Sequence, residues 1–557
     1  MADRIRTVRL ASPIARRLRY TFPGAAFAVL FACLSFTPSL LPRSSVFQGI
    51  VTGINAAIGY AVGLVLAWMW REFADRGPRA PRTRTWQMFA ALSALAGVAA
   101  IVVGQIWQHR IRDLMGMEQE SLLLVWIIPV LGFAIFFVLI EIARGTRWCH
   151  HRVSALLGRV MGVRAARATG FIALAALVVM FATGTLWNAI MSAADRAFAL
   201  SDLTTPNSAT QPDTGLRSGG PGSLLDWDDL GRQGRSFVGR GPGAAEISDF
   251  TGETAREPIR IFAGTAAADE AEERATLAVR DLERSGGFDR ENLLVVTTTG
   301  SGFVEPSAVN SFEYLTDGDS ATVGMQYSHF PSWLSYLVDQ EKAREAGRAL
   351  FDEVYAHWAA MPADDRPKIY VFGESLGSYG GETAFSGEFD MASRTDGALF
   401  VGPPNFNQRY REFVDERAPS TPEIEPVYND GRIVRFTTDP SSPAPPRNQP
   451  WAGTRVLYLQ QPSDPIVWWN TDLLLQRPDW LEEARGSDVL RAMHWIPFVT
   501  FWQVTADLPL GTEVPTGHGH VYQGEHVDGW AAILQPDGWT EEKADELREI
   551  VIDTLYK

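Results

Sequence analysis

Five long apolar stretches occupy the first 194 residues of this 557-residue chain and restrict its fold more than any other feature. Each is close to the roughly 20 residues that an α-helix needs to cross a bilayer. Buried helices of a large soluble core are the alternative, but the near absence of charge inside the stretches favours membrane spans. The sequence therefore predicts an all-α transmembrane bundle of five helices over 1–194, with spans at 23–41, 49–70, 87–107, 121–142 and 169–190.

Charge is distributed unevenly along the chain. Residues 1–194 hold 20 arginines, no lysine and seven acidic residues, whereas 195–557 hold 30 basic and 58 acidic residues. The arginines gather before the first stretch and after the second and fourth, and positive loops stay on the cytoplasmic side. We expect a multi-pass protein of the cytoplasmic (inner) membrane, in contact with membrane lipids, with a cytoplasmic N-terminus and an extracytoplasmic C-terminal part. The net charge of −15 argues against a nucleic-acid partner.

Two further segments follow the apolar region. Residues 195–256 are rich in Gly, Ser, Pro and Asp, which predicts a flexible extracytoplasmic linker. Over 257–557, short β-branched runs alternate with helical stretches, a pattern typical of a mostly parallel central sheet with helices on both faces. Ligands of such sheets bind beyond the carboxyl ends of the strands. We therefore expect a functional site at that edge.

One motif carries chemistry. Gly373-Glu374-Ser375-Leu376-Gly377 matches G-x-S-x-G and directly follows the expected strand Ile369–Phe372. A sharp strand-to-helix turn raises the serine Oγ above the sheet, and the flanking glycines avoid clashes that a Cβ would make. A tight turn with a bystander serine is the structural alternative. We predict that Ser375 is a nucleophile.

A serine nucleophile needs an oxyanion hole made of backbone N–H groups. Leu376 begins the helix after the nucleophile and supplies one such group. Gly300 and Ser301 follow an earlier strand and are candidates for the second. Glycine-rich strand ends also bind phosphates, but no Lys-Ser/Thr follows this one, which disfavours a nucleotide loop.

A serine hydroxyl also needs a base, which in hydrolases of this kind follows the nucleophile and an acid along the chain. His518 and His520 lie in a Gly-rich loop before an expected final helix. His520 is favoured because of its spacing to that helix, and His518 is the alternative base. His494 lies in an apolar run and is expected to be packed in the core.

The acid that orients the histidine has two candidates. Asp464 follows the strand-like run Val456–Gln460, where a carboxylate can hold an imidazole and stabilise its charged form. Asp439 is the competitor, at the end of another strand-like run. Asp464 is favoured.

Neither metal nor cofactor is expected. A metal site at His518, His520 and His526 would need further ligands at suitable spacing, and none is evident. The chain has two cysteines, both in its first 194 residues, so the exported part forms no disulfide. The many aromatic residues of 450–505 belong either to the core or to a cap or apolar acyl pocket.

Long segments of the chain resemble the membrane-anchored α/β-hydrolase family 9 of GC-rich bacteria. The resemblance covers nearly the whole chain and implies an α/β-hydrolase fold, with Ser375, Asp464 and a histidine of the GHGH segment as the catalytic triad. It does not imply a particular substrate. The segments that carry it are FTPSLLPR (36–43), DLGRQGRSFV (229–238), FPSWLSYLVD (330–339), GESLGSYG (373–380), YLQQPSDPIVWW (458–469) and GHGHVY (517–522).

These features together predict a membrane-anchored, extracytoplasmic serine hydrolase of esterase or lipase type. It would act through an acyl-serine intermediate on ester bonds of lipids or acylated envelope molecules. An envelope acyltransferase with the same triad is one alternative, since both reactions share the acyl-enzyme. A non-catalytic membrane binding or assembly module is the other.

Overall fold

The computed structural model describes residues 20–75, 81–157 and 184–556, together with the single positions 77, 162, 165 and 169. The chain divides into two compact units. Unit 1 consists of Met1–Asn188, Thr471–Glu482 and Ser487–Leu510, and unit 2 of Ala189–Asn470, Glu483–Gly486 and Gly511–Lys557. Most of the segment 471–510 therefore belongs to unit 1 with the N-terminal helices, although the residues before and after it belong to unit 2.

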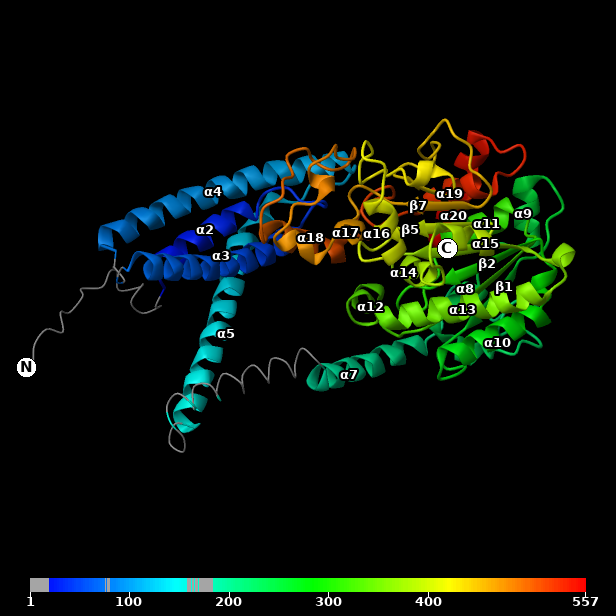
Figure 1. The fold of residues 1–557 in the computed structure, drawn as a ribbon, viewed down its shortest axis with the longest axis horizontal. Coiled ribbons are helices and arrows are strands. Elements are labelled where there is room, and N and C mark those ends of the chain that lie inside the picture. The colour runs from blue at the N-terminus through cyan, green and yellow to red at the C-terminus, as the bar shows by residue number, and fades with distance from the viewer. Residues whose placement is uncertain are drawn as a thin grey trace, which may run out of the picture. The chain divides into compact units, whose positions relative to one another are not determined.

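Unit 1 is built from long helices (Figure 1). They are α2 (Phe22–Leu34), α3 (Ser45–Ala74), α4 (Thr83–Leu114) and α5 (Ile127–Leu157), with a short 3₁₀ turn, η1 (Leu122–Trp126), before α5. Glycines allow α3 to pack closely against α2 and α5. A Cβ at Gly53 would lie 2.6 Å from Ile135 Cβ, and one at Gly63 would lie 2.6 Å from Pro23 O. Small residues at helix contacts are typical of membrane bundles.

The described residues contain three helices long and apolar enough to cross a membrane: Ser45–Ala74, Thr83–Leu114 and Leu122–His150. The first predicted span differs, because α2 has only 13 residues. Ser35 Oγ donates to Ala32 O and Thr37 Oγ1 to Leu34 O, each at 2.7 Å, and Pro38 has no N–H with which to continue the helix. The fifth predicted stretch, 169–190, lies mostly outside the described residues.

The 471–510 segment contributes α18 (Val499–Asp507) and the 3₁₀ turns η6 (Thr471–Leu474), η7 (Asp479–Leu481) and η8 (Leu508–Leu510) to unit 1. Figure 1 shows α18, in orange, beside one end of α3. Arg43 Nε lies 3.1 Å from Asp507 Oδ1, and both side chains are 0% exposed. Gln503 Nε2 donates to Thr37 O at 2.8 Å. These polar contacts fix α18 to the turn between α2 and α3.

Unit 2 is organised around a seven-stranded parallel sheet with the order β1-β3-β2-β4-β5-β7-β6. Almost every strand residue is buried, as expected when helices cover both faces of a sheet. The parallel sheet predicted over 257–557 is therefore confirmed. The strands are β1 (Ile259–Ala263), β2 (Asn292–Thr297), β3 (Ser320–Met325), β4 (Lys368–Glu374), β5 (Gly397–Val401), β6 (Val434–Thr437) and β7 (Arg455–Leu459).

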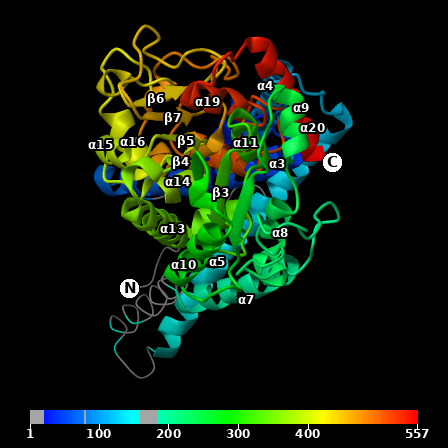
Figure 2. The same cartoon turned by 90° about the vertical axis from the view of Figure 1, so that its right-hand side faces the viewer.

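Helices cover both faces of this sheet (Figure 2). One layer contains α10 (Ala271–Arg284), α13 (Gln340–Ala360) and α14 (Leu376–Glu382), and the other contains α11 (Pro306–Leu315), α19 (Glu525–Leu534) and α20 (Glu541–Tyr556). Right-handed crossovers explain why α11 lies on the opposite face, because the step from β2 back to β3 runs opposite to the steps β1 to β2, β3 to β4 and β4 to β5 that carry α10, α13 and α14. The remaining helices are α7 (Thr185–Asp202), α8 (Gly231–Val238), α9 (Ala244–Thr251), α12 (Ser332–Val338), α15 (Glu388–Arg394), α16 (Gln408–Asp415) and α17 (Pro465–Trp468).

The 195–256 segment, expected as a flexible linker, packs against β1 within unit 2. The Phe237 ring contacts the Phe262 ring, with centroids 5.9 Å apart. The Arg217 guanidinium donates to three backbone carbonyls of 238–242 and pairs with Glu257 at 3.1 Å. The polar composition thus reflects turns whose carbonyls satisfy a buried arginine, and not a freely extended chain.

Candidate active site

Ser375 occupies a sharp turn between β4 and α14. Its backbone has φ 53° and ψ −126°, a region that residues other than glycine rarely adopt and that costs on the order of 1–3 kcal/mol. The turn is held because Ser375 N donates to Val401 O at 2.8 Å. A Cβ at Gly377 would overlap Thr297 O, and one at Gly373 would overlap Gly377 O. The two glycines of the motif are therefore required by the close backbone approach on which the turn depends.

The candidate oxyanion donors follow the strands β4 and β2. Leu376 is the first residue of α14, and the first N–H groups of a helix have no intrahelical acceptor. The loop that holds Gly300 and Ser301 follows β2, which pairs with β4 so that Thr297 lies opposite Gly373. Gln326 Nε2 donates to Ser301 O at 3.1 Å and holds that loop. The two candidate sources of oxyanion donors thus follow the ends of neighbouring strands.

Asp464 and His520 form a buried pair. His520 Nδ1 lies 2.7 Å from Asp464 Oδ2, and the side chains are 10% and 0% exposed. Asp464 follows β7 and caps α17: its Oδ1 accepts from Ile466 N at 2.8 Å, while Oδ2 also accepts from Tyr522 Oη at 2.7 Å. The carboxylate is therefore fixed from three sides, as an orienting acid requires.

The electrostatics of this pair favour a charged imidazole. Burial opposes the charge on His520, but attraction to the carboxylates of Asp464, Glu374 and Glu305 outweighs it, so the pKa of His520 is raised above its ordinary value. A histidine that takes a proton more readily is better suited to act as a base toward a hydroxyl.

The imidazole of His520 lies against the backbone next to the residue that binds Ser375 N. A Cβ at Gly402 would lie 2.5 Å from His520 Cε1, and Gly402 follows Val401, whose carbonyl accepts from Ser375 N. Within the described parts of the chain, no hydrogen bond joins Ser375 Oγ to the ring. Catalytic hydrogen bonds are often long before substrate binds and shorten in the complex. The structure thus brings the nucleophile, acid and base candidates to the ends of the adjacent strands β4, β5 and β7.

The competing candidates lie elsewhere. The Asp464 carboxylate pairs with His520, while His518 lies two residues earlier in a turn where its N–H donates to Pro515 O at 3.2 Å. Asp439 is a loop carboxylate that accepts from the side chains of Ser441 and Ser442. His494 is exposed and belongs to unit 1, in contrast to the packed position expected from its apolar neighbours.

The described residues contain no group of three His, Cys, Asp or Glu arranged to hold a metal ion. His526 does not join His518 and His520 in such a group. Its ring lies instead between Ser307, with Oγ 2.8 Å from Nδ1, and Glu374, with Oε2 2.9 Å from Nε2.

Sequence reasoning missed that second histidine–carboxylate pair, whose carboxylate belongs to Glu374, the residue before Ser375. Glu374 occupies the first x position of G-x-S-x-G, where the motif accepts any residue. Its position next to Ser375 was the only feature of the sequence that could have indicated a role. Glu305 and Ser307 gave none, because their proximity to His526 arises from the crossover between β2 and β3.

Aromatic rings from α12, α14, the segment after β5 and the end of α17 contact one another. Tyr336 lies 4.9 Å from Phe406 and 6.0 Å from Trp469 between ring centroids, and Tyr379 of α14 lies 5.0 Å from Phe406. The aromatic residues of 450–505 are thus divided between the two units. Trp469 joins this cluster, whereas others belong to unit 1.

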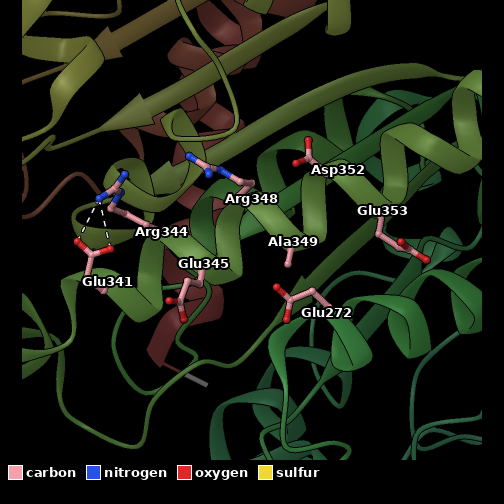
Figure 3. Close-up of a pocket in the computed structure, with 8 residues that line it drawn as sticks. All are labelled: Glu272, Glu341, Arg344, Glu345, Arg348, Ala349, Asp352 and Glu353. Carbon is pink, nitrogen blue, oxygen red and sulfur yellow. Dashed lines mark hydrogen bonds and ion pairs between the residues drawn. The ribbon is translucent and has the colours of Figure 1, made fainter.

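A charged hollow of about 500 Å³ lies elsewhere on unit 2, between α10 and α13 (Figure 3). Arg344 pairs there with Glu341 at 3.1 Å. Ser375, Asp464 and His520 do not line this hollow. Its lining residues are Glu272, Glu341, Arg344, Glu345, Arg348, Ala349, Asp352 and Glu353.

Two family models match the chain. One, described as an alpha/beta-hydrolase family, matches residues 259–547, and the other, described as the N-terminus of an alpha/beta-hydrolase family, matches residues 36–242. No curated protein and no solved structure matches significantly.

Proposed function

The chain belongs to the alpha/beta-hydrolase family, as its motifs predicted, and on that premise we propose that it is a membrane-anchored, extracytoplasmic serine hydrolase that cleaves ester bonds of lipids or acylated envelope molecules. The observation that carries the proposal is the 2.7 Å contact between His520 and Asp464, beside the strained backbone of Ser375. Members of one fold family can carry different activities, so the activity depends on the residues of the site.

In the proposed reaction, Ser375 Oγ attacks the ester carbonyl while His520 Nε2 takes its proton. The tetrahedral oxyanion is stabilised by the N–H of Leu376 and an N–H of Gly300 or Ser301. His520 then returns the proton to the leaving alcohol, which leaves an acyl-serine. Water attacks this intermediate with the same histidine as base, and the carboxylic acid and free serine are released. Asp464 orients the imidazole and stabilises its charged form throughout.

The aromatic cluster supports an apolar acyl group as part of the substrate. The cluster includes Tyr379 of α14 and Trp469 at the end of α17, the helices that Ser375 and Asp464 cap. Apolar, aromatic walls are typical of ligand sites.

Anchoring in the membrane is supported by the three long apolar helices of unit 1. Side chains of α4 such as Leu92, Leu95 and Val98 are exposed. Side chains that contact lipid are expected to be exposed in this way when no bilayer surrounds the helix. The arginine-rich loops favour a cytoplasmic N-terminus.

A fluorophosphonate probe, which reacts with activated serines, tests the proposal on the full chain in detergent. The wild-type protein is expected to be labelled, and Ser375→Ala is expected to abolish labelling. Ser386→Ala, at an exposed serine of the same unit, is the matched control and should label like wild type. Labelling that persists in Ser375→Ala would overturn the assignment.

A further inference from the structure

A buried cluster of two carboxylates, a histidine and a serine adjoins Ser375 through Glu374, the preceding residue. None of its members belongs to the proposed triad. Glu374 ends β4, Glu305 caps the start of α11, Ser307 lies in the first turn of α11, and His526 lies in α19. His526 contacts Ser307 Oγ at 2.8 Å and Glu374 Oε2 at 2.9 Å. Glu305 Oε1 accepts from Ser307 N at 3.2 Å and from its Oγ at 3.1 Å.

The two carboxylates face the same small space. A cavity of about 10 Å³ is lined by Glu305 and Glu374, together with residues at the ends of β2 and β4. A volume of this size admits roughly one water molecule, so the carboxylates are separated by little solvent. Like charges in such a place are costly unless something compensates for them. His526 compensates for Glu374, and no cation of the described residues is bonded to Glu305.

The ionisation of Glu305 reflects this position. Burial, followed by repulsion from Glu374, raises the pKa of Glu305 to about 7. Burial opposes charge on His526, but the contact with Glu374 and the fields of Glu305 and Glu525 raise its pKa. As the pH rises through 7, Glu305 therefore gains a negative charge close to the nucleophile turn.

Resting on the proposed function, we propose that Glu374 and Glu305, held by His526 and Ser307, are positioning residues for the reaction. Their carboxylates form a second negative field that stabilises protonated His520 in addition to Asp464. Two groups contact His520, namely Asp464 after β7 and Tyr522 in its own loop, and the charges of Glu374 on β4 and Glu305 at the start of α11 act on it electrostatically. Those that face His526 are Ser307, Glu374, Glu305 and Glu525.

The sign of the effect follows from the charge. Removing a negative charge near His520 lowers the affinity of its imidazole for a proton, so the base stays neutral to a lower pH. The acid limb of the pH–rate profile therefore moves to lower pH. Because the imidazolium of the transition state is less stabilised, the plateau rate also falls. A residue with a purely structural role would lower the rate without moving the limb.

The test measures the fluorophosphonate labelling rate of the full chain in detergent as a function of pH. Glu305→Gln keeps the shape of the side chain and is expected to shift the acid limb by about 0.5–1 pH unit to lower pH. Glu374→Gln is expected to shift it in the same direction. Glu382→Gln is the matched control, since burial also raises the pKa of Glu382 to about 7 but its carboxylate accepts from Tyr410 N and Tyr458 Oη, away from His520.

The wild-type profile gives a second measurement that needs no variant. If the ionisation of Glu305 is coupled to that of His520, two interacting ionisations should fit the acid limb of the wild-type profile better than one. A single ionisation near the ordinary histidine value of about 6.5 would overturn the inference. So would an unshifted limb in folded Glu305→Gln and Glu374→Gln. Failure of the proposed function is recognised separately, by absent labelling of wild type or persistent labelling of Ser375→Ala.

Discussion

His520 Nδ1 lies 2.7 Å from Asp464 Oδ2 although 56 positions separate the two residues in the sequence. Both belong to unit 2, yet most of the chain between them folds within unit 1. Asp464 is fixed at the start of α17, and His520 is fixed where its N–H donates to Gly511 O at 2.7 Å. The two partners are therefore held within unit 2 on either side of the segment that folds mostly in unit 1.

Replacing Asp464, the proposed orienting acid, should abolish most of the reactivity of Ser375. Asp464→Asn keeps the shape of the side chain but no longer stabilises a charged imidazole, so the labelling rate should fall by on the order of 10³–10⁴-fold. Asp439→Asn is the control and should leave the rate unchanged, because that carboxylate bonds to Ser441 and Ser442. Equal rates in Asp464→Asn and wild type would exclude Asp464 as the acid.

Gly377, two residues after Ser375, should not tolerate a side chain. A Cβ at Gly377 would overlap Thr297 O, so Gly377→Ala must displace the nucleophile turn. We expect the free energy of unfolding to fall by about 3 kcal/mol. Most of the fluorophosphonate labelling should also be lost. Gly387→Ala, where a Cβ meets nothing within 4 Å, should change stability by less than about 0.5 kcal/mol. Thermal unfolding and labelling of both variants distinguish local crowding from a general intolerance of glycine replacement.

The buried ion pair of unit 1 should be essential to the docking of α18. Arg43→Met leaves the Asp507 carboxylate buried without its cation, which costs about 3–5 kcal/mol. The double variant Arg43→Met/Asp507→Leu removes both charges and should be more stable than Arg43→Met alone. The thermal midpoint of the full chain in detergent measures both effects.

A partly exposed ion pair offers the comparison for that experiment. Arg344→Ala disrupts the pair with Glu341 and should cost at most about 1 kcal/mol. If Arg43→Met were no more destabilising than Arg344→Ala, the buried pair would not secure α18.

Stability should fall as the pH rises toward neutrality. Burial raises the pKa of Glu382 from an ordinary 4.5 to about 7, so the folded state holds this proton more tightly than the unfolded state. Its contribution to the free energy of unfolding therefore declines between pH 4.5 and about 7, and Glu305 and Glu525 act in the same direction. Thermal midpoints measured across this range should decline less in Glu382→Gln than in wild type. An identical decline in both would contradict the assignment.

The sequence was most informative where local pattern and fold coincide. The buried strands of unit 2 have continuous apolar runs, so the parallel sheet and the turn at Ser375 followed from short-range signals. Gly373 and Gly377 were interpretable from sequence because their role depends on backbone sterics that any chain shares.

Features that depend on distant pairing were not predictable. Glu305 and His526 meet only because α11 and α19 share one face of the sheet, and neither residue carries a local signal. The shortness of α2 depends on side chains of Ser35 and Thr37 that close its last turn, within a stretch that hydropathy alone treats as continuous. The packing of 195–256 likewise depends on Arg217, whose carbonyl partners lie about 20 residues further along.

The membership of α18 in unit 1 has a practical consequence for anyone preparing the protein. A water-soluble fragment cut after the N-terminal helices would retain Asp507 and Gln503 but lose Arg43 and the Thr37 carbonyl. In such a fragment the Asp507 carboxylate would have lost its ion-pair partner, and apolar side chains of α18 would be exposed to water. Both lie in the segment that connects Asp464 to His520. Inactivity or aggregation of that preparation would then report on the missing partner helices and not on the catalytic chemistry.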